Sequence, residues 1–185
     1  MNDIIPAILA KSSADLDSKL AQIPKGVKFV HIDVLEQDFW TDTNIGFEAH
    51  LMVQLPEEIM ERWVERGAKR IIVHRLNEVT KGFRGRVEIG LGVELNIPIE
   101  EIFPLIPEVD FIHLMSIAAI GGQGRPLDET IFDRIRRVKE KFPQVIISVD
   151  GGIKVTNYQA LIDAGADRLA VGSDFKNLWN SLTKK

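Results

Sequence analysis

Two histidines and two aspartates stand at or near the ends of apolar runs in this chain, namely His31, Asp33, His50 and Asp150. Residues i and i+2 of a β-strand point to the same face, so His31 and Asp33 project together from one strand end. Imidazole nitrogens and carboxylate oxygens are ligands of divalent transition metals. One such residue is more often a satisfied polar group or a turn cap. The four together predict a site for one divalent ion that also supplies acid and base groups.

Eight short β-branched or apolar runs have to position these residues. They cover residues 4–9, 27–34, 49–53, 70–73, 89–95, 111–115, 145–149 and 168–171. Several lack the apolar and polar alternation of a sheet with one wet face, as in 145–149. Strands of this kind are buried on both faces, as parallel strands are, and parallel strands need crossover connections.

Helical patterns fill most of the gaps between these runs. Residues 56–64, 128–142 and 156–164 have apolar residues at helical spacing and end near glycine or proline, and 15–21, 99–106 and 174–182 are shorter candidates. Strand and helix alternating to a count of eight predict a compact α/β fold, a (β/α)8 TIM barrel, forming a single domain over residues 1–185. An open doubly wound sheet has the same local pattern.

Two crossovers are too short for full helices. The stretch between Asp33 and His50 is rich in polar residues and glycine, so we expect its helix, the second, to be missing or reduced. The stretch 76–88 contains Gly82 and Gly85, so we expect the fourth helix to be shortened to a turn or two.

Composition excludes several function classes. The chain is 45% hydrophobic and 27% charged with a formal net charge of -4, and its interspersed charges offer no basic face for nucleic acid. It has no cysteine, so a metal must use nitrogen and oxygen ligands. No export signal and no apolar stretch of the ~20 residues that span a bilayer are visible, which predicts a cytoplasmic protein without membrane contact.

The order of short motifs resembles that of the ribulose-phosphate 3-epimerase family over nearly the whole chain. The matching segments are Pro6-Ala7-Ile8-Leu9, Val30-His31-Ile32-Asp33-Val34, Asn44-Ile45-Gly46, His50-Leu51-Met52-Val53, Pro56-Glu57, Gly67-Ala68, Met115-Ser116, Gly121-Gly122-Gln123, Val149-Asp150-Gly151-Gly152-Ile153, Ala164-Gly165-Ala166-Asp167 and Gly172-Ser173. Asp-Gly-Gly and Ala-Gly-Ala-Asp recur in many phosphate-binding barrels. His-x-Asp followed by His-Leu-Met and Val-Asp-Gly-Gly is much more specific.

The resemblance implies a metal-dependent isomerase of carbohydrate metabolism in the pentose phosphate pathway, which interconverts D-ribulose 5-phosphate and D-xylulose 5-phosphate. The family's metal ligands fall on His31, Asp33, His50 and Asp150. The ion would be zinc, iron(II), manganese or cobalt, and Asp33 and Asp150 would exchange the C3 proton. Epimerisation removes a proton from one face of a carbon and returns one to the other, so it needs two acid/base groups on opposite sides of an enediolate. The ion would stabilise the enediolate oxygens as a Lewis acid.

A phosphorylated ketose also needs a phosphate site. Barrels commonly build one from the loops after strands seven and eight. We expect substrate and phosphate contacts from His50, Gly121, Gly122, Gly151, Gly152, Gly172 and Ser173. The same glycines also suit tight strand-to-helix turns. Met52 and Met115 match family positions around the sugar, His74 and Glu94 are candidates to support the ligands, and His113, inside a strand, is interpreted as structural.

The chain departs from the family at three places. Leu35-Glu36-Gln37 replaces the usual Met-Asp-Gly, Ala7 replaces a serine, and the sixth loop lacks its usual Pro-Gly-Phe. These changes keep two alternatives open, an epimerase of another ketose phosphate such as allulose 6-phosphate and a non-catalytic barrel that binds a sugar phosphate. A homo-oligomer is also compatible with the resemblance.

Overall fold

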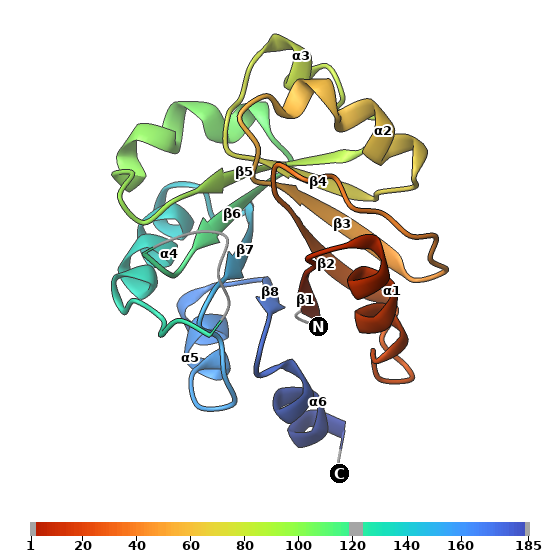
Figure 1. Cartoon of the computed structure of the whole chain (residues 1–185). Helices are drawn as coiled ribbons and strands as arrows, with labels where there is room; N and C mark the ends of the chain where they lie inside the picture. The colour runs from red at the N-terminus through yellow and green to blue at the C-terminus, as the bar shows by residue number, and fades with distance from the viewer. Residues whose placement is uncertain (1–2, 119–123, 184–185) are drawn as a thin grey trace.

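The computed structural model, which describes residues 3–118 and 124–183, contains a closed barrel of eight parallel strands in the order β1 to β8 (Figure 1). The strands are β1 Asp3–Leu9, β2 Phe29–Val34, β3 Gly46–Leu51, β4 Arg70–Val73, β5 Glu88–Val93, β6 Phe111–Met115, β7 Ile146–Asp150 and β8 Arg168–Val171. Strand β1 pairs in parallel with both β2 and β8, so the sheet has no open edge. The predicted (β/α)8 barrel is therefore confirmed, and the open doubly wound sheet is excluded.

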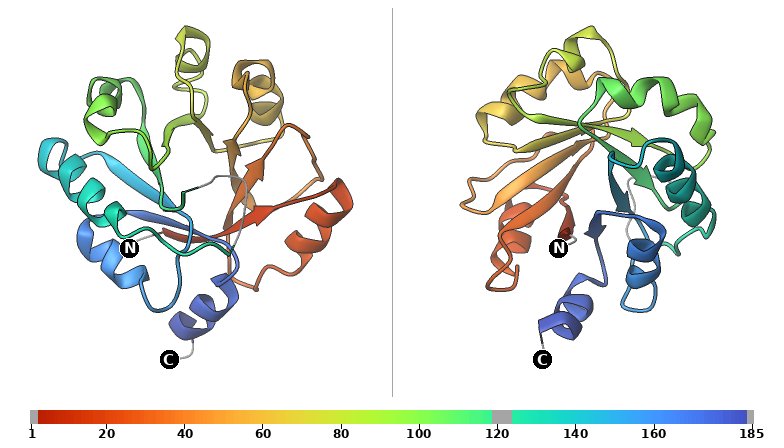
Figure 2. Two further views of the ribbon diagram at one scale, coloured as in Figure 1. Left: turned by 60° about the vertical axis from the view of Figure 1, so that its left-hand side comes forward. Right: turned by 180° about the vertical axis from the view of Figure 1, so that it is seen from behind.

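Helices surround the barrel on its outside (Figure 2). They are α1 Ser13–Ala21, α2 Met60–Glu65, α3 Glu78–Lys81, α4 Thr130–Lys141, α5 Tyr158–Ala164 and α6 Phe175–Thr183, with two 3-10 helices, η1 Pro56–Glu58 and η2 Ile99–Glu108. The helix expected over 56–64 divides into η1 and α2. Segment η2 contains Pro104 and Pro107, which have no N–H to donate to an α-helical ladder.

Two of the crossovers are reduced, as expected. Residues 35–45, all of them described, connect β2 to β3 without a helix, and α3 has only four residues. In place of the missing helix, the ring of Trp40 lies 5.1 Å from that of Phe47 and 5.4 Å from that of Trp63. The guanidinium of Arg66 covers both tryptophan rings. A loop with aromatic side chains thus shields the barrel wall that the helix would have covered.

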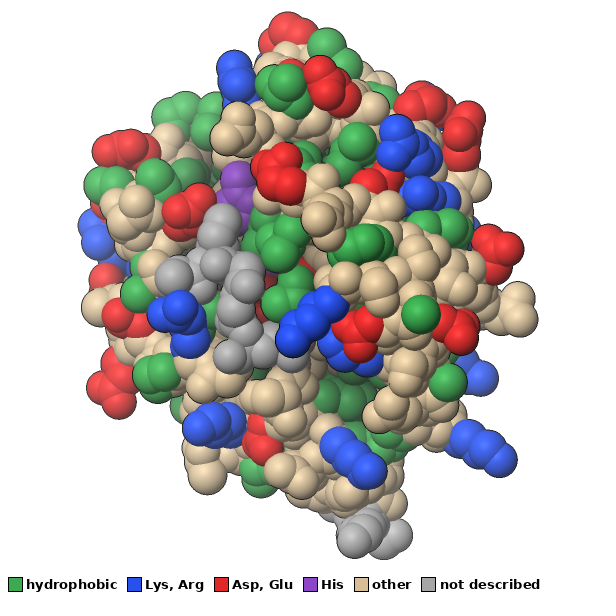
Figure 3. All heavy atoms as spheres, viewed as in Figure 1, with side chains coloured by type: hydrophobic (Ala, Val, Ile, Leu, Met, Phe, Trp, Pro, Cys, Tyr) green, Lys and Arg blue, Asp and Glu red, His purple; other side chains and the backbone are tan. Residues whose placement is uncertain are grey.

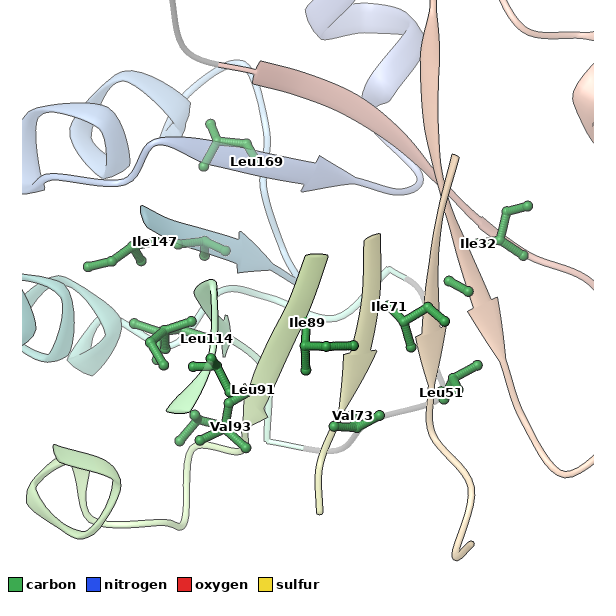
Figure 4. Packing of buried hydrophobic residues seen from close by; sticks show 14 of the residues in the cluster. Ile32, Leu51, Ile71, Val73, Ile89, Leu91, Val93, Leu114, Ile147 and Leu169 are labelled. Carbon is green, nitrogen blue, oxygen red and sulfur yellow. The ribbon is translucent and has the colours of Figure 1, made fainter. Parts of the chain in front are cut away.

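Strand parity separates an apolar layer from a polar interior. Alternate residues of the strands pack between barrel and helices, as Figure 4 shows for Ile32, Leu51, Ile71, Val73, Ile89, Leu91, Val93, Leu114, Ile147 and Leu169. Burying one such side chain stabilises the fold by roughly 1.5–3 kcal/mol. A slip of one residue would exchange the two faces, so this layer fixes the register of every strand. The same register directs the intervening polar residues into the barrel.

The surface carries acidic and basic side chains side by side on the face seen in Figure 3, with no continuous basic patch there. Among the residues that the structure describes, no helix is both long enough and apolar enough to cross a membrane.

Candidate metal centre and adjoining pocket

Strands β2 and β3 bring three of the predicted ligands together. Asp33 and His50 are register partners, and His31 lies two residues before Asp33 on the same face. The Nε2 atom of His31 lies 3.1 Å from Asp33 Oδ1 and 3.2 Å from His50 Nδ1. His50 Nδ1 is also 3.2 Å from Asp33 Oδ1. Three donor atoms therefore surround one point inside the barrel.

Strand β7 contributes the fourth predicted ligand from the other side of the barrel. The Oδ2 atom of Asp150, the last residue of β7, lies 3.9 Å from both His31 Nε2 and His50 Nδ1. Its neighbour in register on β6 is Met115, and two residues before Met115 lies His113. His113 Nε2 is 3.8 Å from Asp150 Oδ2.

These separations fit a divalent ion. Ligands about 2.0–2.2 Å from a tetrahedral ion lie roughly 3.3–3.6 Å from one another, and the five distances among His31, Asp33, His50 and Asp150 run from 3.1 to 3.9 Å. A second grouping, His31, His50, His113 and Asp150, has donor atoms within 4.8 Å of one another. A buried cluster of three histidines and aspartate can thus hold a divalent metal.

Partners behind the histidines fix the orientation of their rings. His31 Nδ1 donates to Glu48 Oε1 at 2.7 Å, and Arg70 Nε lies 3.0 Å from Glu48 Oε2. Behind His50, the Nε2 atoms of His50 and His74 are 2.8 Å apart. Such partners hold a ligand histidine in the tautomer that presents a lone pair to the ion.

The room for the His74 ring comes from a glycine of β5. A Cβ atom at Gly92 would lie 2.8 Å from His74 Nε2. His74 Nδ1 lies 3.7 Å from Glu94 Oε1, so the support expected from Glu94 is an electrostatic contact rather than a hydrogen bond. His74 is the partly exposed histidine of this group, and Figure 3 shows histidine surface beside acidic side chains.

The two aspartates have opposite pKa shifts. Burial raises the pKa of Asp150 to about 6, and the nearby charge of Asp33 adds to this effect. Burial also opposes ionisation of Asp33, but hydrogen bonds from His31 and His50 outweigh it and hold the pKa of Asp33 well below its usual range. Without an ion, Asp33 is a carboxylate near neutral pH, whereas Asp150 takes up a proton far more readily.

The histidines also have pKa shifts in opposite directions. Burial opposes protonation of His31, but its hydrogen bonds to Asp33 and Glu48 raise its pKa well above the ordinary value. Burial lowers the pKa of His113 to about 3 and that of His74 to about 4, with neighbouring histidines adding to both shifts. Protonated His31 thus balances the negative charge of the carboxylates, and a bound metal ion would displace that proton.

A single cavity joins the aspartates to the loops expected to bind phosphate. Its lining includes Asp33 and Asp150, the methionines Met52 and Met115, and Gly151, Gly152, Gly172 and Ser173. Gly121 and Gly122 lie outside the described residues. Gly152 has a φ of 64°, and a Cβ there would lie 2.3 Å from the backbone nitrogen of Leu127, so the fold requires glycine at this position with or without a phosphate.

Sequence reasoning missed four residues near this site. His113 lies two residues before the inward-facing Met115 within the expected strand 111–115, so strand parity could have placed it in the barrel interior, whereas Glu48 precedes the expected strand 49–53. His113 was interpreted as structural, yet its ring lies among the metal-site histidines. Arg125 and Lys154 line the cavity near the glycine loops, where no local motif marks them.

Fold and site together define a (β/α)8-barrel protein with a candidate divalent metal centre at the carboxyl ends of its strands. A mutant tryptophan synthase alpha-subunit from Pyrococcus furiosus has a similar structure, with a TM-score of 0.69, 15% identity and 98% of both chains covered. The tryptophan synthase alpha subunit of Campylobacter jejuni matches with a TM-score of 0.63 and 16% identity, covering 95% of this chain and 90% of that one. At such identities the likeness shows the fold alone.

Sequence comparison identifies the family. The chain belongs to the ribulose-phosphate 3-epimerase family, whose model matches residues 3–175. The ribulose-phosphate 3-epimerase of Chlamydia muridarum is 31% identical over 199 residues, covering 93% of this chain and 87% of the relative. The ribulose-phosphate 3-epimerase of Schizosaccharomyces pombe is 23% identical over 194 residues, covering 92% of this chain and 85% of the relative.

Proposed function

We propose that this protein is an isomerase that epimerises D-ribulose 5-phosphate to D-xylulose 5-phosphate by proton exchange at C3. The observation that carries the proposal is the cavity that Asp33 and Asp150 share with Gly151, Gly152, Gly172 and Ser173. A ketose phosphate placed there would have its reacting carbon at the carboxyl groups and its phosphate at the loops. Membership of the epimerase family supports the same assignment.

Asp33 and Asp150 would be the acid/base pair. They come from β2 and β7 and line the same cavity, so they approach a bound sugar from different parts of the barrel wall. Their pKa values are pushed apart, which marks one group as the base and the other as the acid. Asp33 as carboxylate would remove the C3 proton, and protonated Asp150 would return one to the opposite face; the reverse reaction exchanges the roles.

The proposed metal ligands are His31, Asp33, His50 and Asp150. When bound, a divalent ion such as zinc, iron(II), manganese or cobalt stabilises negative charge on the enediolate oxygens as a Lewis acid. His31 and His50, oriented by Glu48 and His74, would bind the ion as neutral ligands and would not themselves reduce its positive charge. Met52 and Met115 would pack against the sugar carbons and exclude water.

The phosphate would lie at the carboxyl ends of β7 and β8. Helix α6 begins at Phe175, two residues after Ser173, so its positive N-terminal end would favour an anion at this end of the cavity. Arg125 and Lys154 line the same cavity and would add positive charge. The phosphate would thereby fix the distance from the anion to C3.

Proton exchange tests the proposal directly. The protein, loaded in turn with zinc, iron(II), manganese and cobalt, is incubated with D-ribulose 5-phosphate in D2O. We expect deuterium at C3 and formation of D-xylulose 5-phosphate, both followed by NMR. The variants Asp33→Asn and Asp150→Asn should lose this exchange while retaining the fold by circular dichroism. Absence of exchange with every metal would refute the proposal.

A substrate panel separates the alternatives. Faster exchange with allulose 6-phosphate than with ribulose 5-phosphate would assign the protein to another ketose phosphate, as the altered Leu35-Glu36-Gln37 segment after β2 allows. A thermal shift with sugar phosphate but no exchange with any ketose phosphate would identify a non-catalytic binding barrel, because binding to the native state stabilises it without turnover.

A further inference from the structure

His113 combines complete burial with an unused nitrogen. Its side chain has no exposed surface, and its Nδ1 atom lies 3.1 Å from Ser148 Oγ, its register partner on β7. Among the residues that the structure describes, its Nε2 atom is buried without a hydrogen-bond partner. A buried polar atom without a partner costs free energy, so a residue of this kind in a native protein calls for an explanation.

The unpartnered nitrogen lies among the metal-site donors. His113 Nε2 is 3.8 Å from Asp150 Oδ2, too far for a hydrogen bond. The His113 ring stacks on that of His31 with centroids 5.3 Å apart and meets the His50 ring edge-on at 4.7 Å. The donor atoms of His31, His50, His113 and Asp150 all lie within 4.8 Å of one another. Opposite ligands of one ion are about 4.0–4.4 Å apart, so a shift of a fraction of an ångström brings all four into contact with an ion.

We propose that His113 is a further protein ligand of the metal ion, which binds from the barrel interior alongside His31, His50 and Asp150. This inference rests on the metal site of the proposed function and adds a ligand to it. A proton on Nδ1 donates to Ser148 Oγ and leaves the Nε2 lone pair for the ion, as the orientation of a ligand histidine requires. Three imidazoles and carboxylates suit a first-row transition metal rather than magnesium or calcium.

A ligand at His113 has a consequence for the aspartates. Asp33 and Asp150 are each proposed both to bind the ion and to move a proton, and a carboxyl group that gains a proton is a poor ligand. With His31, His50 and His113 as neutral ligands, the ion keeps three protein nitrogens whichever aspartate is protonated. His113 would thereby hold the ion in place during proton transfer.

Cobalt(II)-loaded protein provides a direct count of the ligand histidines. Each histidine bound through one nitrogen carries an N–H on the other, and this proton gives a strongly shifted, solvent-exchangeable NMR signal. In the native protein the N–H groups face Glu48, His74 and Ser148 and are shielded from solvent. We expect three such signals in the native protein and two in His113→Leu. A matched control, Met115→Leu on the same strand, should keep three.

Metal affinity gives a second readout, measured by competition with a chelator in the absence of sugar. We expect His113→Leu to bind cobalt at least tenfold more weakly and to change its visible absorption spectrum. If His113→Leu does not fold, His113→Gln replaces it, with the same two signals expected. Two signals in the native protein, or an unchanged affinity and spectrum in the variant, would overturn the inference.

The result can be told apart from failure of the proposed function. Three imidazole signals in a protein that exchanges no C3 proton would refute the epimerase activity and leave the ligand assignment standing. Two signals in a protein that does exchange C3 would refute only the role of His113. A protein that binds no cobalt would refute the role of His113, whereas the epimerase activity would still be decided by exchange with the other metals.

Discussion

On the β2–β3 side of the metal centre the side chains are hydrogen-bonded to one another, whereas on the β6–β7 side they stand apart. His31, Asp33 and His50 lie within 3.1–3.2 Å of each other, and Glu48 supports His31 at 2.7 Å. On the other side, the closest distances from Asp150 Oδ2 to the histidine nitrogens are 3.8–3.9 Å. Both sides are buried inside the same barrel.

The β2–β3 half of the site is therefore preformed by its own hydrogen bonds, whereas the β6–β7 half needs a bound ion to complete its contacts. A proton on His31 satisfies Asp33 and Glu48 in the metal-free protein, so the β2–β3 side is stable by itself. Asp150 has no comparable hydrogen-bond partner within residues 3–118 and 124–183, and burial raises its pKa to about 6. The carboxyl group on the β7 side is therefore the one whose charge most needs the ion.

The largest expected effect comes from exchanging the two aspartates for asparagine. Asp33→Asn and Asp150→Asn should each lower C3 exchange by at least roughly 10²–10⁴-fold, because each removes a proton-transfer group. Their effects on the metal-free protein should have opposite signs at pH 7.5. Asp150→Asn removes an unfavourable buried charge and should raise the free energy of unfolding by about 1–3 kcal/mol.

Asp33→Asn removes the acceptor shared by His31 and His50 and should lower the free energy of unfolding by about 1–3 kcal/mol. Urea unfolding of both metal-free variants measures the difference. Equal shifts in the same direction would show that the two halves of the site do not differ in this way.

The next largest effects are expected from Glu48 and Ser148, the hydrogen-bond partners of His31 and His113, whose substitution should weaken metal binding to different extents. Glu48→Gln weakens the acceptor for His31 and removes the charge opposite Arg70, so we expect metal affinity to fall roughly 10–100-fold. Ser148→Ala removes only a neutral partner of His113 and should cost less than about tenfold. Chelator competition with zinc gives both values. A larger loss in Ser148→Ala than in Glu48→Gln would reverse the assignment of the stronger half.

Substitution of Gly92 tests whether His74 orients the ring of His50. Gly92→Ala places a Cβ atom against the His74 ring and should displace it, so we expect metal affinity to fall by about tenfold. His74→Gln should have a similar effect, because it weakens the partner of His50. If both act through His50, the double variant loses no more than the worse single variant. Additive losses would show that Gly92 acts elsewhere.

A further expected effect is a pH dependence of the free energy of unfolding. The pKa of His113 is about 3 in the folded metal-free protein and near 6.5 in the unfolded chain, so the unfolded state binds more protons between these values. This residue therefore makes the native protein lose stability as pH falls from about 6.5 towards 3. His113→Leu should lose less stability than the native protein over that range, as urea titrations at several pH values will measure. If the free energy of unfolding changed equally with pH in both proteins, the lowered pKa of His113 would be contradicted.

Much of the fold could be predicted from the local sequence. The eight apolar runs, the polar stretch after Val34 and the short 76–88 segment predict the barrel and its two reduced crossovers, because burial and helix length are local properties. The third strand was misplaced: it covers Gly46–Leu51 instead of 49–53. Its first residues include Gly46 and Glu48, which look unlike a buried strand until the barrel interior supplies partners for the carboxylate.

The sequence by itself determined which donor atoms are available and which face of each strand they occupy, since residues two apart on a strand always share a face. It thereby brought His31 and Asp33 together, and the family motifs added His50 and Asp150. Only the tertiary structure decided that His113 joins them, that Glu48 and His74 orient the rings, and that the two aspartates differ in pKa. Those properties depend on distances across the barrel and on burial, which closure of the sheet sets and local spacing does not encode.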